Sequence, residues 1–389
     1  MPFSPVAPVA VALLLSGCLG AARSNPDNPA FTTLLGDSAN QVGNAVVETA
    51  DGGAFVVGYT TANGTDAYLA RLTRAGDTAW TRTIGGPGSE VAWDVLANDD
   101  GSFSVAGFAD AEEGGGDMWL LTIGPDGRTL RERRYPHPGD ERATGLVRGP
   151  EGSLLLVGQT VAPGGGAEDA RVVLVDAGGD TVWTRTIAGP GRDRLFAGAA
   201  DARGAVLVGL ISDSPSRSDS AHADRDAWVV ALDWRGNLRW THRDRMPGHQ
   251  TTHHVIPRGD VAIVTAYGQA SFAGDNDAYL YAIDADGVVR WKRRAAGAGD
   301  DRAMMSMAWG TGLLTAGYSR APGGDWEMWL VESDAEGRTI AQRTLPNRGD
   351  DWAVMVAPTG DGGYLLTGKL AAPDRGADLV VMRRAGPGL

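Results

Sequence analysis

The chain has 389 residues, including 56 glycines, 12 tryptophans and a single cysteine, and its formal net charge is −13. One cysteine excludes an internal disulfide and a metal site built from several thiolates, and the acidic charge argues against nucleic-acid binding, since phosphate recognition requires a basic surface. Apolar residues at 43% and charged residues at 21% are typical of a globular chain with a large core.

The N-terminal segment has the pattern of a lipoprotein signal peptide. Residues 6–15 are apolar but too few to span a membrane, and Ser16, Gly17 and Cys18 follow them. The run from Leu15 to Cys18 resembles the lipobox of bacterial lipoproteins, although residues 1–10 lack the usual Lys or Arg. We therefore expect residues 1–17 to be a signal peptide, Cys18 to be lipidated, and residues 18–30 to form a flexible tether. An ordinary cleaved signal and a buried structural cysteine are the alternatives.

From residue 31 onward, a unit of about 51 residues occurs seven times. In each unit a strand-like apolar run ends in a small residue, which we call the glycine anchor. The seven anchors are Gly58, Gly107, Gly158, Gly209, Ala266, Gly317 and Gly368. A tryptophan stands four residues after the glycine of a tight turn in four units, at Trp80, Trp183, Trp240 and Trp291.

Each unit has room for four short strands, a to d, which in the first unit lie near residues 44–49, 54–59, 67–73 and 79–84. The b runs are apolar on both faces of the pleat, as expected for a small sheet packed between two neighbours. Four-stranded sheets repeated around an axis form a β-propeller, whereas a stack of helical repeats does not fit these turn-rich short runs. We therefore predict an all-β fold, a seven-bladed β-propeller over residues 31–389.

The spacing near the two ends of the repeats indicates how the ring closes. Phe31 lies 27 residues before Gly58, just as Trp80 lies 27 residues before Gly107, so residues 31–35 occupy a fourth-strand position with no unit before them. No fourth strand is expected after the third strand at 379–382. We predict that residues 31–35 pair with residues 379–384 and complete the seventh blade, which removes two open sheet edges.

A carboxylate or an amide stands ten residues after each fourth-strand position, and we call these seven residues the polar ring. Its members are Gln41, Glu90, Glu141, Asp193, Gln250, Asp301 and Asp351. Such a side chain either forms hydrogen bonds with the loop that leads into strand a or contributes to a ring that binds a cation such as calcium. Glutamine at two positions favours the structural role, because an amide replaces a carboxylate better in a hydrogen bond than as a counter-charge. We expect no cofactor and no metal.

Residues that differ between units are the better candidates for recognition. Three positions after the polar ring the chain places Asn44, Trp93, Thr144, Phe196, His253 and Met304, which we call the mouth residues. The b-to-c connections also vary, and the longest is the insertion at 210–225. These connections open on the same face as the d-to-a connections, so we expect this loop face to be the binding surface. The histidines within 249–254 fall on a loop entering a strand, which does not suit a metal site.

Several segments resemble the repeats of bacterial secreted and lipid-anchored β-propeller proteins, which include WD-like and quinoprotein-like repeats. The matching pieces are 51–59, 117–120 and 233–240, and the resemblance extends over nearly all of residues 31–384. The segment 282–291 also resembles the tryptophan-docking motif of quinoprotein dehydrogenases, but it is one residue short. The resemblance implies the fold, while most such proteins have no assigned activity.

Together these patterns favour a non-enzymatic lipoprotein of the cell envelope that binds a protein or a glycan through its loop face. We expect it to be a monomer that contacts the membrane only through its lipid, in the outer membrane or at the cell surface or periplasmic face, and to bind no nucleic acid. No residue is assigned a catalytic role. The alternatives are an envelope hydrolase or lyase that uses acidic residues at the mouth with a divalent cation, and a structural surface component.

Overall fold

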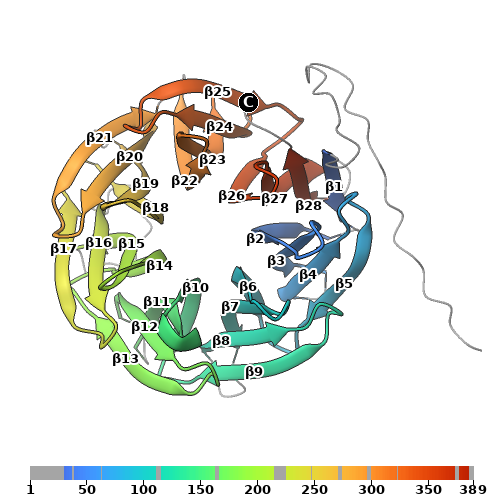
Figure 1. The fold of residues 1–389 in the computed structure, drawn as a ribbon, viewed down its shortest axis with the longest axis horizontal. Helices are drawn as coiled ribbons and strands as arrows, with labels where there is room; N and C mark the ends of the chain where they lie inside the picture. Colours follow the sequence, from blue (N-terminus) through green and yellow to red (C-terminus); the bar gives the residue numbers. More distant parts are fainter. Residues whose placement is uncertain are drawn as a thin grey trace, which may run out of the picture.

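The computed structural model describes residues 30–36, 39–62, 64–110, 115–162, 166–213, 225–246, 248–269, 274–295, 299–321, 323–372 and 376–384. These residues form seven four-stranded antiparallel sheets that stand as blades around a central axis (Figure 1). The predicted seven-bladed β-propeller is confirmed. In the described part of the chain the only helical element is the single turn η1 (Pro150–Gly152), and no helix there is long and apolar enough to cross a membrane.

Each blade runs outward from strand a at the axis to strand d at the rim, in sequence order (Figure 1). The strands of blades 1 to 3 are β2 (Gln41–Glu48), β3 (Ala54–Thr60), β4 (Asp66–Leu72) and β5 (Thr78–Ile84); β6 (Glu90–Ala97), β7 (Phe103–Asp110), β8 (Gly116–Ile123) and β9 (Thr129–Tyr135); and β10 (Asp140–Arg148), β11 (Leu154–Val161), β12 (Glu168–Val175) and β13 (Thr181–Ile187).

The strands of blades 4 to 6 are β14 (Arg194–Asp201), β15 (Gly204–Ser212), β16 (Arg225–Asp233) and β17 (Leu238–Asp244); β18 (Gln250–Arg258), β19 (Val261–Gln269), β20 (Asn276–Asp284) and β21 (Val289–Ala295); and β22 (Asp300–Trp309), β23 (Gly312–Arg320), β24 (Glu327–Ser333) and β25 (Thr339–Leu345). Blade 7 consists of β26 (Trp352–Pro358), β27 (Tyr364–Ala372), β28 (Gly376–Arg384) and the N-terminal strand β1 (Phe31–Leu35).

The seventh blade is closed as predicted. Strand β1 pairs antiparallel with β28, in a register that places Phe31 opposite Arg383 and Leu35 opposite Leu379. The two strands lie side by side at the rim in Figure 1. A buried arginine adds a second link across this junction, because Arg383 donates to Glu48 Oε1 (3.1 Å) and to the carbonyl of Gly52 (2.7 Å) in blade 1. Closure therefore combines a β-ladder with an ion pair between the last blade and the first.

Two strand boundaries differ from the expected ones. The inner strand of blade 1 begins at Gln41 and not near residue 44, because the ladder with β3 extends through the polar-ring position. The insertion after blade 4's second strand is shorter than 210–225, because β15 continues to Ser212 and β16 already begins at Arg225. Residues 214–224 of that insertion lie outside the described residues.

The hydrophobic core lies between the blades. Separate apolar clusters fill the interfaces of blades 1 and 2, 2 and 3, 3 and 4, and so on around the ring to blades 7 and 1. Each b strand contributes apolar side chains to the interfaces on both faces of its blade. In blade 3, for example, all eight residues of β11 are buried. This accounts for the apolar runs that show no alternation in the sequence.

At four blade junctions a tryptophan at the rim packs on the c-to-d turn of the next blade. The Trp80 ring lies over Gly127 in the c-to-d turn of blade 2, and its Nε1 donates to the carbonyl of Pro125 (3.1 Å). Gly127 has a φ of +83° and a Cβ there would lie 3.2 Å from the indole, so both the backbone and the contact favour glycine. The same packing recurs in the pairs Trp183–Gly236, Trp240–Gly287 and Trp291–Gly337, and Phe31 takes the tryptophan's place over Gly76.

Candidate functional site

The polar ring is buried, and its side chains form hydrogen bonds inside the blades. Glu141 accepts from the Thr160 hydroxyl (2.7 Å), Asp301 accepts from Ser319 (2.6 Å), and Gln41 donates to Thr60 (3.2 Å), so these side chains bind the end of strand b. Others bind the preceding d-to-a loop, as when Glu90 accepts from the Gly86 N–H (3.1 Å) and Asp193 accepts from the Gly189 N–H. Gln250 and Asp351 make both kinds of contact.

Burial changes the acidity of this ring. Desolvation raises the pKa of Asp193 and of Asp351 to about 6. Hydrogen bonds that each carboxylate accepts from backbone N–H groups lower the pKa but do not offset the effect of burial. Desolvation also raises the pKa of Glu90 and of Glu141. The second carboxylate oxygen of Glu141, Asp193 and Asp351 has no hydrogen-bond partner among the described residues.

The mouth residues share one structural feature that their sequence spacing did not suggest. Each of the seven inner strands carries a β-bulge against its strand b, and in every blade the extra, unpaired residue is the mouth position. The bulges fall at Asn44, Trp93, Thr144, Phe196, His253, Met304 and, in the seventh blade, Val354.

The bulge also explains the glycine anchors, because it brings the inner strand very close to strand b. A Cβ on Gly58 would lie 1.8 Å from the carbonyl oxygen of Val42, and Gly107, Gly158 and Gly209 show the same approach. A side chain cannot be accommodated at these positions without moving the backbone.

Side chains at and after the bulge cap the inner edge of the following blade. Asn44 donates to the carbonyl of Ala92 (2.9 Å), and Thr144 donates to that of Leu195 (2.8 Å). Next to the bulge, Asp94 accepts from the N–H of Leu146 (2.8 Å). Although Asp94 keeps some contact with solvent, desolvation raises its pKa to about 6. These contacts serve the blade junctions, since innermost strands would otherwise leave backbone groups unpaired.

Phe196 and His253 are brought together by the fold. Their rings stack with centroids 5.0 Å apart and an interplanar angle of 1°, and His253 stacks in turn on Tyr267 at 5.0 Å. His253 lies within β18, so its predicted position on a loop is wrong. Burial lowers the pKa of His253 and of the neighbouring His254 to about 4, which keeps both imidazoles uncharged at neutral pH.

Sequence reasoning missed a second set of variable positions, which we call the collar. It consists of the residue after each polar-ring member and the residue after each glycine anchor, which face each other across strands a and b. The pairs are Val42–Tyr59, Val91–Phe108, Arg142–Gln159, Arg194–Leu210, Thr251–Tyr267, Arg302–Tyr318 and Trp352–Lys369. These positions lie at the loop-face end of the inner strands, and they diverge as much as the mouth residues do.

Collar residues of successive blades interlock. Arg142 of blade 3 lies over the Phe108 ring of blade 2, with its Cζ 4.7 Å from the ring centroid. Arg302 of blade 6 lies 5.6 Å from the Tyr267 ring of blade 5, and Trp352 of blade 7 lies 5.7 Å from the Tyr318 ring of blade 6. The collar therefore brings cations onto aromatic rings at several blade junctions, and these contacts are densest on blades 5 to 7.

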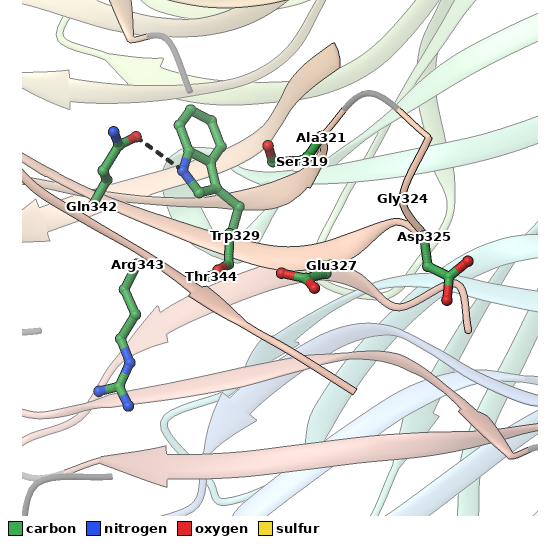
Figure 2. Close-up of a pocket in the computed structure, with 9 residues that line it drawn as sticks. All are labelled: Ser319, Ala321, Gly324, Asp325, Glu327, Trp329, Gln342, Arg343 and Thr344. Atoms are coloured by element: carbon green, nitrogen blue, oxygen red, sulfur yellow. Dashed lines mark hydrogen bonds between the residues drawn. The ribbon is translucent and has the colours of Figure 1, made fainter. Parts of the chain in front are cut away.

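A cleft of about 360 Å³ on blade 6 is lined by residues of β23, β24 and β25 and of the connection between β23 and β24 (Figure 2). Asp325 and Glu327 lie at one end of it, and Trp329 with its hydrogen-bonded partner Gln342 (Nε1 to Oε1, 3.2 Å) lies at the other. The same tryptophan contact occurs at Trp119 with Glu132 and at Trp228 with Thr241, so it belongs to the repeat and not to a site unique to this blade.

The described residues include candidate metal ligands but not the expected lipidation site. In the ranges given above, no group of three or more His, Cys, Asp and Glu side chains could hold a metal ion. Cys18, the expected lipidation site, lies outside the described residues, as do residues 1–17, the predicted signal peptide, and residues 19–29 of the predicted tether.

No protein-family model and no curated protein matches the chain. Among solved structures, it is similar to the WD40 domain of Neurospora crassa Pan2, with a TM-score of 0.56 and 10% identity over 88% of this chain and 90% of that one. It is also similar to the β-propeller domain of the Trilobed protease from Pyrococcus furiosus, with a TM-score of 0.52 and 11% identity over 88% of this chain and 95% of that one. At such identities the similarity establishes the fold alone: the chain is a seven-bladed β-propeller with WD40 and protease propellers among its neighbours.

Proposed function

We propose that the protein is a lipid-anchored binding module of the cell envelope, whose loop face recognises a protein or glycan. The observation that carries this proposal is the contrast between the polar ring and the collar. Polar-ring side chains form hydrogen bonds within the blades, whereas the variable collar side chains gather at the loop face. A rigid ring that presents divergent side chains at one end is an arrangement suited to recognition.

The path of β1 supports an orientation for such an anchored module. Phe31 packs against Gly76 in a c-to-d turn, while Leu35 pairs with Leu379 near the start of β28. The described chain therefore enters β1 at the turn face, opposite the loop face. If Cys18 carries lipid, a tether of 13 residues from 18 to 30 keeps the turn face near the bilayer and leaves the loop face directed away.

Exposed apolar side chains at the turn-face end of the outer strands are consistent with this orientation. One occurs in each of five blades, at Leu130, Val182, Leu238, Val288 and Ile340, and they are 48–63% exposed. Singly exposed apolar residues are common on protein surfaces, so their regular position at one rim is the informative feature.

The binding role is tested by retention of envelope extract on the immobilised protein. We expect Arg320→Glu combined with Lys369→Glu, at the loop face, to lose the retained component. The matched control, Arg128→Glu combined with Arg235→Glu, changes two exposed turn-face cations and should retain it. Equal retention by both double variants, or none by the wild type, would contradict the proposal.

The anchor and the orientation are tested separately. Cys18→Ser should move the protein from the membrane fraction to the soluble fraction, because the acyl chains supply the membrane affinity. In the lipidated protein, a fluorophore on Asp126→Cys at the turn face should be quenched by lipid-bound nitroxide more strongly than one on Ala321→Cys at the loop face. Equal quenching would contradict the orientation.

A further inference from the structure

Cations and aromatic rings form one continuous group on blades 6 and 7, which we call the sector. It consists of Arg302, Tyr318, Arg320, Trp326, Trp352 and Lys369. The guanidinium carbons of Arg302 and Arg320 lie 4.7 and 4.4 Å from the Trp326 ring centroid, and Lys369 Nζ lies 4.5 Å from that of Trp352. Tyr318 connects the two tryptophans, with centroid distances of 5.1 and 5.7 Å.

The two arginines of the sector carry more positive charge than the acid that contacts them. Asp300 interacts with both Arg302 Nε (3.2 Å) and Arg320 (3.8 Å). Asp350 accepts from the backbone N–H of Trp326 (3.1 Å), and Asp351 interacts electrostatically with Lys369. Two guanidinium groups thus share one carboxylate, in a chain that carries 48 acids and 35 basic residues. The positive charge left at the two arginines favours an anionic ligand at this place.

The arginines keep donors in position for that ligand. Stacking on an aromatic ring uses the face of a guanidinium, so its N–H groups point outward in the plane of the group. Among the described residues, Arg302 donates a hydrogen bond to Asp300 through Nε, and its two Nη groups make none. Arg320 is 43% exposed at its side chain. A carboxylate can therefore bind at the edge of either group without breaking the stack.

We propose that the sector binds a saccharide that carries a carboxylate group. The flat C–H faces of a sugar ring pack on half-buried aromatic side chains, and the carboxylate pairs with an arginine or Lys369. A neutral sugar leaves the two Nη groups of Arg302 without an anionic acceptor, and a small anion makes no contact with the aromatic rings. A nucleic-acid strand brings a phosphate at every residue toward a chain of net charge −13. This inference rests on the proposed recognition role of the loop face.

The test is titration of the full chain with trigalacturonic acid, sialyllactose and N-acetylmuramic acid, followed by calorimetry and tryptophan fluorescence. We expect saturable binding of at least one of them, weakened at least tenfold by Arg302→Gln and by Trp352→Ala. The matched control is Arg142→Gln. Arg142 occupies the same repeat position as Arg302 and also lies over an aromatic ring, that of Phe108, but it belongs to blade 3, outside the sector. Circular dichroism verifies folding, and Lys369→Gln replaces Arg302→Gln if that variant unfolds. For trigalacturonic acid, the methyl ester should bind at least tenfold more weakly.

Three results would overturn the inference: no saturable binding of any of the three saccharides, equal loss of binding in Arg142→Gln, or tighter binding of a single-stranded oligonucleotide or an acidic peptide. Retention of an envelope component by the loop face together with failure of all three saccharides would leave the proposed function standing and reject only the ligand class.

Discussion

Ring closure by the N-terminal strand can be tested at one side chain. Phe31 is 9% exposed and occupies the position over Gly76 that tryptophan takes over the turn glycines of other blades. Removing its ring by Phe31→Ala leaves an unfilled space beside Val381 and Leu72 in the cluster between blades 7 and 1. A buried Phe→Ala change costs about 3–5 kcal/mol, and the lower end applies because a terminal strand can shift to fill part of the space.

That cost translates into a small but measurable change in melting temperature. An unfolding entropy of about 2.1 cal/mol/K per residue over a propeller of roughly 350 residues gives about 0.7 kcal/mol per degree, so a loss of about 3 kcal/mol lowers Tm by about 4 °C. Because a loosened β1 also uncovers the edge of β28, we expect Phe31→Ala to form oligomers on prolonged incubation.

Two variants make this experiment decisive. Phe31→Trp should keep the wild-type Tm, because Trp80, Trp183, Trp240 and Trp291 show that an indole fits over a turn glycine. Thr32→Ala, on the exposed side of the same strand, should change Tm by less than about 1 °C. Thermal unfolding followed by circular dichroism, with size-exclusion chromatography, measures both effects. A Phe31→Ala protein that melts at the wild-type temperature, or a Phe31→Trp protein no more stable than Phe31→Ala, would refute this role of the Phe31 ring.

The remaining predictions concern buried charges. Arg383→Met should lower the free energy of unfolding, measured by urea denaturation, by about 3 kcal/mol, because it leaves Glu48 and Asp361 without their buried partner. The control Arg71→Met breaks the more exposed pair with Asp51 and should cost under about 1 kcal/mol. Equal effects of the two changes would contradict this prediction. Asp94, Asp193 and Asp351 have folded-state pKa values of about 6, above the ordinary value of 3.8. Between these two pKa values the folded protein binds more protons than the unfolded chain does. The stability of the fold should therefore rise as the pH falls from 7.5 to about 5. We expect Tm to rise by about 3 °C over this range, and to fall below about pH 4, where acids with a lowered pKa such as Asp51 and Asp361 lose their charge; a Tm that declines steadily from pH 7.5 would refute it.

The number of blades, the strands in each blade and the partner of the first strand could all be predicted from the amino-acid sequence. These features are local or periodic: the anchors repeat about every 51 residues, and Phe31 stands at the spacing of Trp80. The turn glycines and their tryptophans were also visible, although only the structure shows that each indole packs on the turn of the next blade.

Which side chains meet at the loop face could be learned only from the three-dimensional arrangement of the blades. A bulge in every inner strand interrupts the alternation of faces, so positions counted from the repeat alone do not reveal that the mouth residue is the unpaired one. The collar was missed for a related reason, because Arg302 meets Tyr267 and Trp352 meets Tyr318 across blade junctions, between residues separated by some 35 positions. Periodicity describes one blade at a time, whereas contacts between blades depend on how the ring closes.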